Sequence, residues 1–100
     1  MQRRSLIALA SLAVLASAPA FAAGDIKIAH VYSKTGPLEA YGKQTQTGLM
    51  MGLQYATGGT MQVNGKKITV IERDDQGKPD LGKSLLAAAY ADDKVDLAVG

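Results

Sequence analysis

Cysteine and tryptophan are absent from this sequence of 100 residues, which contains only five aromatic residues and one histidine. Without cysteine the chain can form no disulfide framework, and it has no amino-terminal cysteine to which a lipid could be attached. His30 has no second histidine and no cysteine with which to share a metal ion, so we predict no metal site and interpret it as a core residue with satisfied hydrogen bonds. The protein is expected to be soluble and unanchored.

A strong excess of one charge is also missing. The formal net charge of +2 includes Arg3 and Arg4, which belong to an amino-terminal segment that we expect to be removed. Without them, nine basic residues stand against nine acidic ones, and the chain is formally neutral. Electrostatic binding to phosphates depends on a basic excess, so we predict no nucleic-acid partner.

Residues 1–22 have the three parts of a secretory signal peptide. Arg3 and Arg4 form a positive start, residues 6–16 form an uncharged apolar core, and Ala20-Phe21-Ala22 is a cleavage site of the A-x-A type. The apolar core is too short to span a bilayer comfortably, and no stop-transfer pattern follows it. We predict cleavage after Ala22 and a location in the bacterial periplasm. The two arginines leave both the general and the twin-arginine export routes open.

Residues 23–100 form the expected mature segment, in which strand-forming runs alternate with helical patterns. This order predicts an α/β fold with a doubly wound parallel sheet, and the first strand is apolar on both faces, as buried parallel strands are. The chain ends at Gly100, where a connection would be expected, so we interpret the segment as the incomplete beginning of a longer protein. The expected elements are a strand at 26–32, a helix at 38–56, a strand at 67–73, a helix from 79 to near 92 and a strand at 95–100.

Turn signals separate these elements. Gly58-Gly59 predicts a left-handed end for the first helix. Asn64-Gly65 predicts a tight hairpin turn, which inserts a small ribbon before the second strand. Pro79 suits the first position of the second helix, because its missing N–H would have no partner inside the helix.

The first helix carries a stripe of small and aromatic residues at helical spacing: Tyr41, Thr45, Gly48, Gly52 and Tyr55. Leu49, Leu53 and Ala56 fall on an adjoining stripe. We expect the face formed by these two stripes to lie on the sheet. Each glycine inside a helix costs about 1 kcal/mol relative to alanine, so we interpret Gly48 and Gly52 as sites of close backbone approach. Replacing Gly48 by leucine should then cost about 1–3 kcal/mol through overpacking.

The loop between the first strand and the first helix holds the candidate site, because ligands of open α/β sheets bind at the carboxyl ends of strands. The glycine spacing in this loop matches neither a Walker loop nor a dinucleotide fingerprint, so no cofactor is predicted. The residues could instead only cap the helix, and Tyr41 could equally belong to the helix–sheet core. The candidate ligand-binding residues supply hydroxyls, backbone N–H groups and apolar walls: Ser33, Thr35, Gly36, Leu38 and Tyr41.

No catalytic residue is predicted. The sequence has no G-x-S-x-G motif, and Ser33 and Ser84 have no base beside them in the sequence. Asp74-Asp75 could be a metal site or a phosphoacceptor. Adjacent side chains on an extended chain point in opposite directions, however, and we predict a structural role for this pair.

Several of these segments together resemble a known family. T-G-P at 35–37 with a glycine at 42, N-G-K-K-I at 64–68 and the acidic pair at 74–75 are similar in order and spacing to the periplasmic solute-binding proteins of ABC importers, in the leucine/isoleucine/valine-binding branch. The resemblance implies the type I periplasmic binding protein fold, with residues 23–100 as the first half of the amino-terminal lobe of two. It also implies a monomer that captures a small ligand by hinge closure, delivers it to membrane permease subunits and catalyses no reaction.

The resemblance implies that the main contacts to the ligand carboxylate follow the third strand, beyond Gly100. Tyr41 is a departure, because smaller or aliphatic residues are common at this place in the family, so the ligand could be an aromatic acid instead of an aliphatic amino acid. Two alternatives stay open. The chain could be the ligand-sensing domain of a receptor, or a secreted α/β enzyme whose catalytic residues lie after residue 100.

Overall fold

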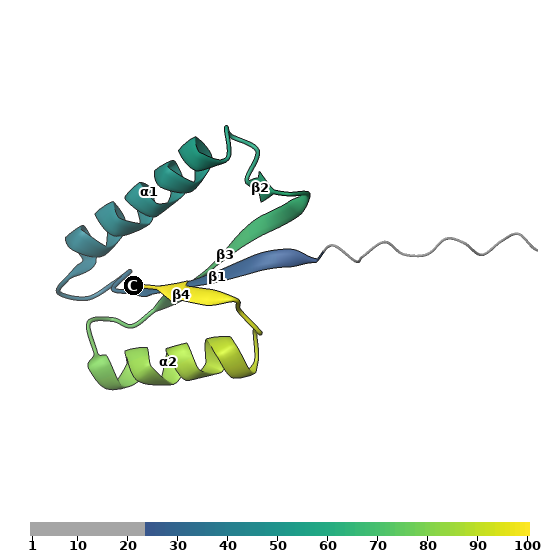
Figure 1. The fold of residues 1–100 in the computed structure, drawn as a ribbon. Helices are drawn as coiled ribbons and strands as arrows, with labels where there is room; N and C mark the ends of the chain where they lie inside the picture. The colour runs from purple at the N-terminus through teal and green to yellow at the C-terminus, as the bar shows by residue number, and fades with distance from the viewer. Residues whose placement is uncertain (1–23) are drawn as a thin grey trace, which may run out of the picture.

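The computed structural model describes residues 24–100 (Figure 1). The predicted signal peptide lies outside the described residues. No helix within the described part of the chain is long and apolar enough to cross a membrane. In chain order the elements are β1 (Asp25–Tyr32), α1 (Glu39–Ala56), β2 (Gln62–Val63), β3 (Lys66–Asp74), α2 (Pro79–Ala91) and β4 (Leu97–Val99).

The strands form one sheet in the order β2-β3-β1-β4, in which β1 runs parallel to both β3 and β4. The short β2 pairs antiparallel with the start of β3, as the ribbon predicted from the sequence requires. Helix α1 lies on one side of the sheet and α2 on the other (Figure 1). The predicted doubly wound α/β fold is therefore confirmed, and the direction of strand addition reverses beside β1.

β1 is the central strand and is buried on both faces. Ile28 and Tyr32 point to one face and Ala29 to the other, and each is at most 6% exposed. Alternate residues of a strand point to opposite faces, so this pattern requires a layer on each side. The sequence, apolar at both sets of positions, correctly predicts a covered parallel strand.

Helix α2 is held to the sheet by apolar packing. Ala89 is completely buried and forms a small core with Ala29 and Val95, against which Ile71 and Ala98 also pack. Pro79 occupies the first turn of the helix, as predicted. The small alanine side chains let the helix approach closely on this face.

Helix α1 contacts the sheet differently, and the inner face chosen from the sequence is wrong for Gly48 and Gly52 but right for the adjoining Leu49 and Leu53, which are half-buried. Within α1, Gly42 alone is fully buried, and a Cβ at this position would lie 1.9 Å from the Ser33 carbonyl oxygen. At Gly48 and Gly52, by contrast, a Cβ would meet no atom of the described residues within 4 Å. The face that turns inward carries Gly42, Gln46, Leu49 and Leu53. Gly42 lets the helix backbone approach the backbone of Ser33, and Gln46 forms a hydrogen bond with His30 of β1.

The predicted turns are confirmed in detail. Asn64 and Gly65 both have positive φ, 52° and 81°, as the tightest hairpin turns require. At the end of α1, Gly58 N–H donates to the Tyr55 carbonyl and Gly59 N–H to the Gln54 carbonyl. This pair of bonds is a Schellman cap, and Gly58, the first residue after the C-cap, has the positive φ of 64° that it needs.

Candidate functional site

A pocket of about 210 Å³ lies at the carboxyl ends of the parallel strands. Its walls come from the end of β1, the loop after it, the first turns of α1, the residue after β3 and the residue after β4. This is the place where strand order reverses beside β1, and open α/β sheets bind ligands at such points. The lining residues are Val31, Tyr32, Ser33, Leu38, Tyr41, Gly42, Thr45, Asp75 and Gly100.

The structure brings three of the five predicted site residues into this pocket. Ser33, Leu38 and Tyr41 line it. Tyr41 is 70% exposed and Leu38 is 49% exposed, so neither belongs to the helix–sheet core of the described residues. Within the described residues Tyr41 is therefore not a core residue, and its exposed ring borders the pocket.

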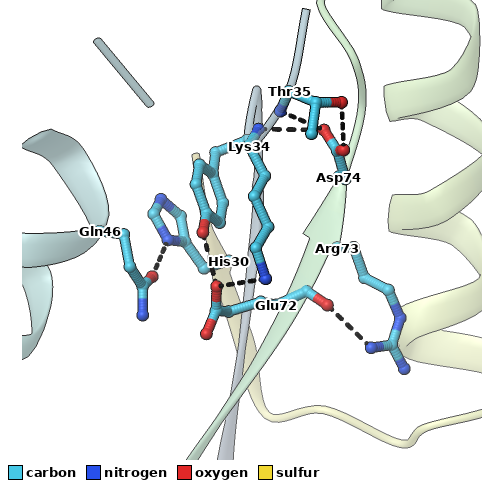
Figure 2. Close-up of polar contacts among 8 residues, drawn as sticks. His30, Lys34, Thr35, Gln46, Glu72, Arg73 and Asp74 are labelled. Atoms are coloured by element: carbon cyan, nitrogen blue, oxygen red, sulfur yellow. Dashed lines mark hydrogen bonds and ion pairs between the residues drawn. The ribbon is translucent and has the colours of Figure 1, made fainter. Parts of the chain in front are cut away.

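Thr35 does not line the pocket. Its hydroxyl donates to Asp74 Oδ2 at 2.6 Å, and its backbone N–H donates to Asp74 Oδ1 at 3.1 Å (Figure 2). The Lys34 N–H donates to the same Oδ1 at 3.0 Å. The hydrogen bond from the Thr35 hydroxyl, followed by those from backbone N–H groups, holds the pKa of Asp74 below its usual range.

Gly36 also lies outside the pocket lining. It allows the loop after β1 to contact the turn after β3. Its φ is +95°, and a Cβ on it would lie 2.8 Å from the Gln76 carbonyl oxygen. A side chain is excluded both by this contact and by the backbone conformation. Gly36 is therefore a structural residue in the described part of the chain.

Two of the pocket hydroxyls, those of Ser33 and Thr45, are already used inside the protein. Ser33 Oγ donates to Asp75 Oδ1 at 2.8 Å, and Thr45 Oγ1 donates to the Tyr41 carbonyl at 2.9 Å. A hydroxyl has one proton to donate, so both groups can offer a ligand only acceptor lone pairs. The Tyr41 hydroxyl makes no hydrogen bond within residues 24–100 and stays available as a donor.

A second polar cluster lies on the α1 side of the sheet. His30 is completely buried, and its Nδ1 is 2.6 Å from Gln46 Oε1, while its Nε2 has no hydrogen-bond partner among the described residues (Figure 2). The prediction of a core histidine is confirmed, but only one of its two nitrogens is satisfied. The His30 ring stacks on Tyr32 at a centroid distance of 4.1 Å.

Tyr32 links this cluster to β3. Its hydroxyl donates to Glu72 Oε1 at 2.5 Å, and the Lys34 ammonium lies 3.6 Å from the same oxygen. Burial, followed by the bond to Glu72, raises the pKa of Tyr32 to about 12. The bond from Tyr32 in turn lowers the pKa of Glu72. Sequence reasoning missed Gln46 and Glu72, because neither has a local signal that links it to β1.

The chemistry of the pocket is that of a binding surface. Within residues 24–100 no cluster of three histidine, cysteine or acidic side chains could hold a metal ion. None of the lining residues is basic, and Asp75 is the one charged group among them. This part of the wall combines apolar and aromatic surface with hydrogen-bond acceptors, and it suits the body of a small molecule better than its carboxylate.

In a comparison with known protein families, residues 25–100 fit the family model described as "Periplasmic binding protein". The chain belongs to the periplasmic binding protein family. A comparison with curated proteins found no match. Membership in this family agrees with the fold and with the resemblance in the sequence.

Solved structures of this family are similar to the chain. An ABC transporter protein from Rhodopseudomonas palustris shares 67% sequence identity over 76% of the chain, with a TM-score of 0.75. The branched-chain amino acid substrate-binding protein LivJ from Streptococcus pneumoniae, solved with isoleucine, shares 26% identity over 76% of the chain, with a TM-score of 0.68. A solute-binding protein of an ABC transporter from Rhodopseudomonas palustris, solved with 3,4-dihydroxybenzoic acid, shares 31% identity over 74% of the chain, with a TM-score of 0.66.

The chain spans only part of these periplasmic binding proteins: 22% of the first two chains and 20% of the third. All three are proteins of ABC transporters, and the second and third are substrate- or solute-binding proteins. The family is extracytoplasmic, which agrees with an exported chain.

Proposed function

We propose that this chain is the first half of the amino-terminal lobe of a two-lobed protein that captures a small solute outside the cytoplasm and delivers it to an ABC importer. The observation that supports this proposal most is the pocket at the point of strand reversal, walled by Leu38 and Tyr41. Family membership supports the same role. In this proposal the membrane permease subunits are the protein partners, and the chain carries out no catalysis.

The ligand proposed is a small carboxylate-bearing molecule, either an amino acid or an aromatic acid. Two similar proteins were solved with molecules of these two kinds, isoleucine and 3,4-dihydroxybenzoic acid. On the wall described above, Leu38 and Tyr41 would contact the apolar body of the ligand, and Ser33 would accept a hydrogen bond from it. We propose that the carboxylate is held by groups that follow Gly100, because the hydroxyls of Ser33 and Thr45 have no free proton for it.

Isothermal calorimetry on the full-length protein tests this function, with isoleucine and 3,4-dihydroxybenzoate as probes. The wild type should bind one of them with a 1:1 stoichiometry. Tyr41→Ala should weaken that binding by about 1–3 kcal/mol, because the ring supplies apolar contact area, and should leave the melting temperature nearly unchanged, because the ring is exposed. Tyr55→Ala, at an exposed tyrosine that does not line the pocket, is the matched control.

Absence of binding to either probe, together with turnover of a covalent substrate, would refute the binding function. An intact affinity in Tyr41→Ala together with a lowered melting temperature would move Tyr41 from the pocket wall to the core.

Export is the second part of the proposal. Residues 1–22 would direct the chain out of the cytoplasm and be cleaved after Ala22. Mass spectrometry of the protein isolated from the periplasm should show a chain that begins at Ala23. A chain that still begins at Met1, or that stays in the membrane fraction, would contradict cleavage.

A further inference from the structure

The loop that leads from β1 into α1, residues 33–38, makes few backbone hydrogen bonds of its own. Within the described residues its internal bonds run from Lys34 N–H to the Tyr32 carbonyl and from Glu39 N–H to the Gly36 carbonyl. Leu38, at the start of α1, has no side-chain cap to fix it there. Another part of the molecule must therefore set the shape of this loop.

Two carboxylates at the end of β3 do this. Asp74 accepts four hydrogen bonds: from the Lys34 and Thr35 N–H groups, from the Thr35 hydroxyl and from the Gln76 N–H at 2.9 Å. Asp75 Oδ1 accepts from Ser33 Oγ and, also at 2.8 Å, from the Gly77 N–H. Each aspartate thus bonds both to its own turn and to the loop after β1. We refer to Asp74 and Asp75 as the carboxylate clamp.

The two members of the clamp differ in position: Asp75 lines the pocket, whereas Asp74 lies next to it. Asp74 and Thr35 are not among the lining residues, whereas Ser33 and Leu38, on either side of the clamped peptides, are. Gly36 rests on the Gln76 carbonyl, so the two loops are also in direct backbone contact. A carboxylate that accepts several N–H and O–H bonds holds those groups in one geometry, since each bond is charge-assisted.

We infer that Asp74 is a positioning residue for ligand binding: it holds the loop after β1 in the shape that places Ser33, Leu38 and Tyr41 around the ligand, and Thr35 is its partner and makes no ligand contact. This inference rests on the proposed function. If the loop also adopts other shapes, the apparent affinity is the intrinsic affinity multiplied by the fraction of molecules whose loop has the binding-competent shape. The clamp therefore acts on affinity through preorganisation.

Hydrogen exchange on the ligand-free, full-length protein tests the clamp by itself. In Asp74→Ala, the Lys34 and Thr35 amides should exchange at least about 10-fold faster than in the wild type, while the amides of β1 keep their protection. Asp74→Asn, which retains one acceptor oxygen, should show a smaller increase. The control is Asp92→Ala, at an exposed carboxylate just after the end of α2, which should leave the exchange rates of the Lys34 and Thr35 amides unchanged. Unchanged exchange at Lys34 and Thr35 in Asp74→Ala would overturn the inference.

Affinity for the probe that binds the wild type, isoleucine or 3,4-dihydroxybenzoate, tests the positioning role. Asp74→Ala should weaken binding by about 10-fold, as expected if the competent loop shape falls to about a tenth of the population. As a single change, Thr35→Val should weaken binding. Added to Asp74→Ala it should have no further effect, because both changes remove the hydrogen bond between the Thr35 hydroxyl and Asp74. Thr35→Ser, which keeps the hydroxyl, should restore the wild-type affinity.

Additive effects of Thr35→Val and Asp74→Ala would show that Thr35 contacts the ligand directly, and unchanged affinity in Asp74→Ala would show that the clamp positions nothing. Either result overturns the inference. If neither probe binds the wild type, the proposed function fails, and the exchange measurement alone decides whether the clamp holds the loop.

Discussion

The two helices cover opposite faces of one sheet but are attached to it in different ways. Helix α2 is held by packing among small apolar side chains, with Ala89 completely buried against Ala29 and Val95. Helix α1 buries only Gly42 fully and reaches the sheet through the His30–Gln46 hydrogen bond. The attachment of α2 thus depends on side-chain volume. That of α1 rests on one close backbone approach and one polar contact, with half-buried Leu49 and Leu53 on the same face.

This difference agrees with the position of the pocket. Gly42 lines the pocket, and so do Ser33 and Leu38 of the loop before α1. Helix α1 is therefore held to the sheet at the end that lies beside the candidate site. The remaining outer surface of α1 carries exposed Tyr41, Met51 and Tyr55. Attachment at one end of a helix can position a site while leaving most of the helix surface free of packing constraints.

The largest effect is expected from Gly42→Ala. A Cβ would lie 1.9 Å from the Ser33 carbonyl oxygen and 3.1 Å from the Tyr32 ring, so the helix or the loop must move. The free energy of unfolding should fall by about 3 kcal/mol or more, at the upper end of overpacking effects. Urea denaturation measures the loss, and Gly52→Ala, in the same helix but facing open space, is the control. Similar results for the two variants would contradict the attachment at Gly42.

Ala89→Leu breaks the corresponding attachment of α2. Three extra carbons have no space beside Ala29, and the free energy of unfolding should fall by about 1–3 kcal/mol. Thermal denaturation followed by circular dichroism is the measurement. Ala87→Leu, at an exposed position of the same helix, should change stability by no more than about 0.5 kcal/mol. A tolerated leucine at position 89 would mean that α2 is not packed as described.

Tyr32→Phe removes the hydrogen bond to Glu72 on the α1 side of the sheet. Because Glu72 is partly exposed and can be rehydrated, the expected loss is about 1 kcal/mol. Phenylalanine keeps the ring that stacks on His30. Chemical denaturation at neutral pH measures the change, and Tyr55→Phe, at a tyrosine that is 91% exposed, is the control.

The pH dependence of stability sharpens the same test. Burial raises the pKa of Tyr32 from 10.0 to about 12, so its neutral form is favoured in the folded state. The stabilisation is fully present below pH 10 and is lost as pH rises through 12, because the unfolded chain ionises first. The lowered pKa of Glu72 acts in the other direction. Its contribution to stability is fully present above pH 4.5 and is lost as the pH falls through the lowered pKa. In Tyr32→Phe, the free energy of unfolding should fall less steeply between pH 10 and 12 than in the wild type. An unchanged slope in this range would exclude Tyr32 as the cause of the loss.

The smallest effect is expected from Gly48→Leu. Since nothing in the described residues lies within 4 Å of a Cβ there, only helix propensity changes, and stability should rise by about 0.5–1 kcal/mol. Differential scanning calorimetry of this variant and the wild type measures the gain. A loss of about 1–3 kcal/mol would instead restore the sheet-facing assignment made from the sequence.

The elements that the sequence predicts well are those with local signals. Asn64-Gly65 and Gly58-Gly59 specify their turns through backbone conformations that few other residues adopt, and both turns form as predicted. The doubly apolar first strand correctly indicates a covered sheet. In each case the cause and the structure lie within a few residues of one another.

The errors concern partners that are distant in sequence. A helical glycine fits both close packing and open space, so spacing could not distinguish Gly42 from Gly48. The hydroxyl of Thr35 could equally have met a ligand, and its actual partner, Asp74, lies 39 residues away. The structural role predicted for the acidic pair agrees with these bonds, but the sequence did not indicate which loop it would hold.

The pairing of the central strand has a consequence for the order of folding. β1 is made before either of its neighbours, and it pairs with residues about 40 positions later in β3 and about 70 positions later in β4. Closing such long segments costs chain entropy before any sheet contact is gained, and folding slows as contacts become more distant in sequence. Helix α1 can begin to form from bonds within itself, but β1 stays without a partner until residues 66–74 have been synthesised. Assembly of this sheet is therefore a late event that requires most of the described chain.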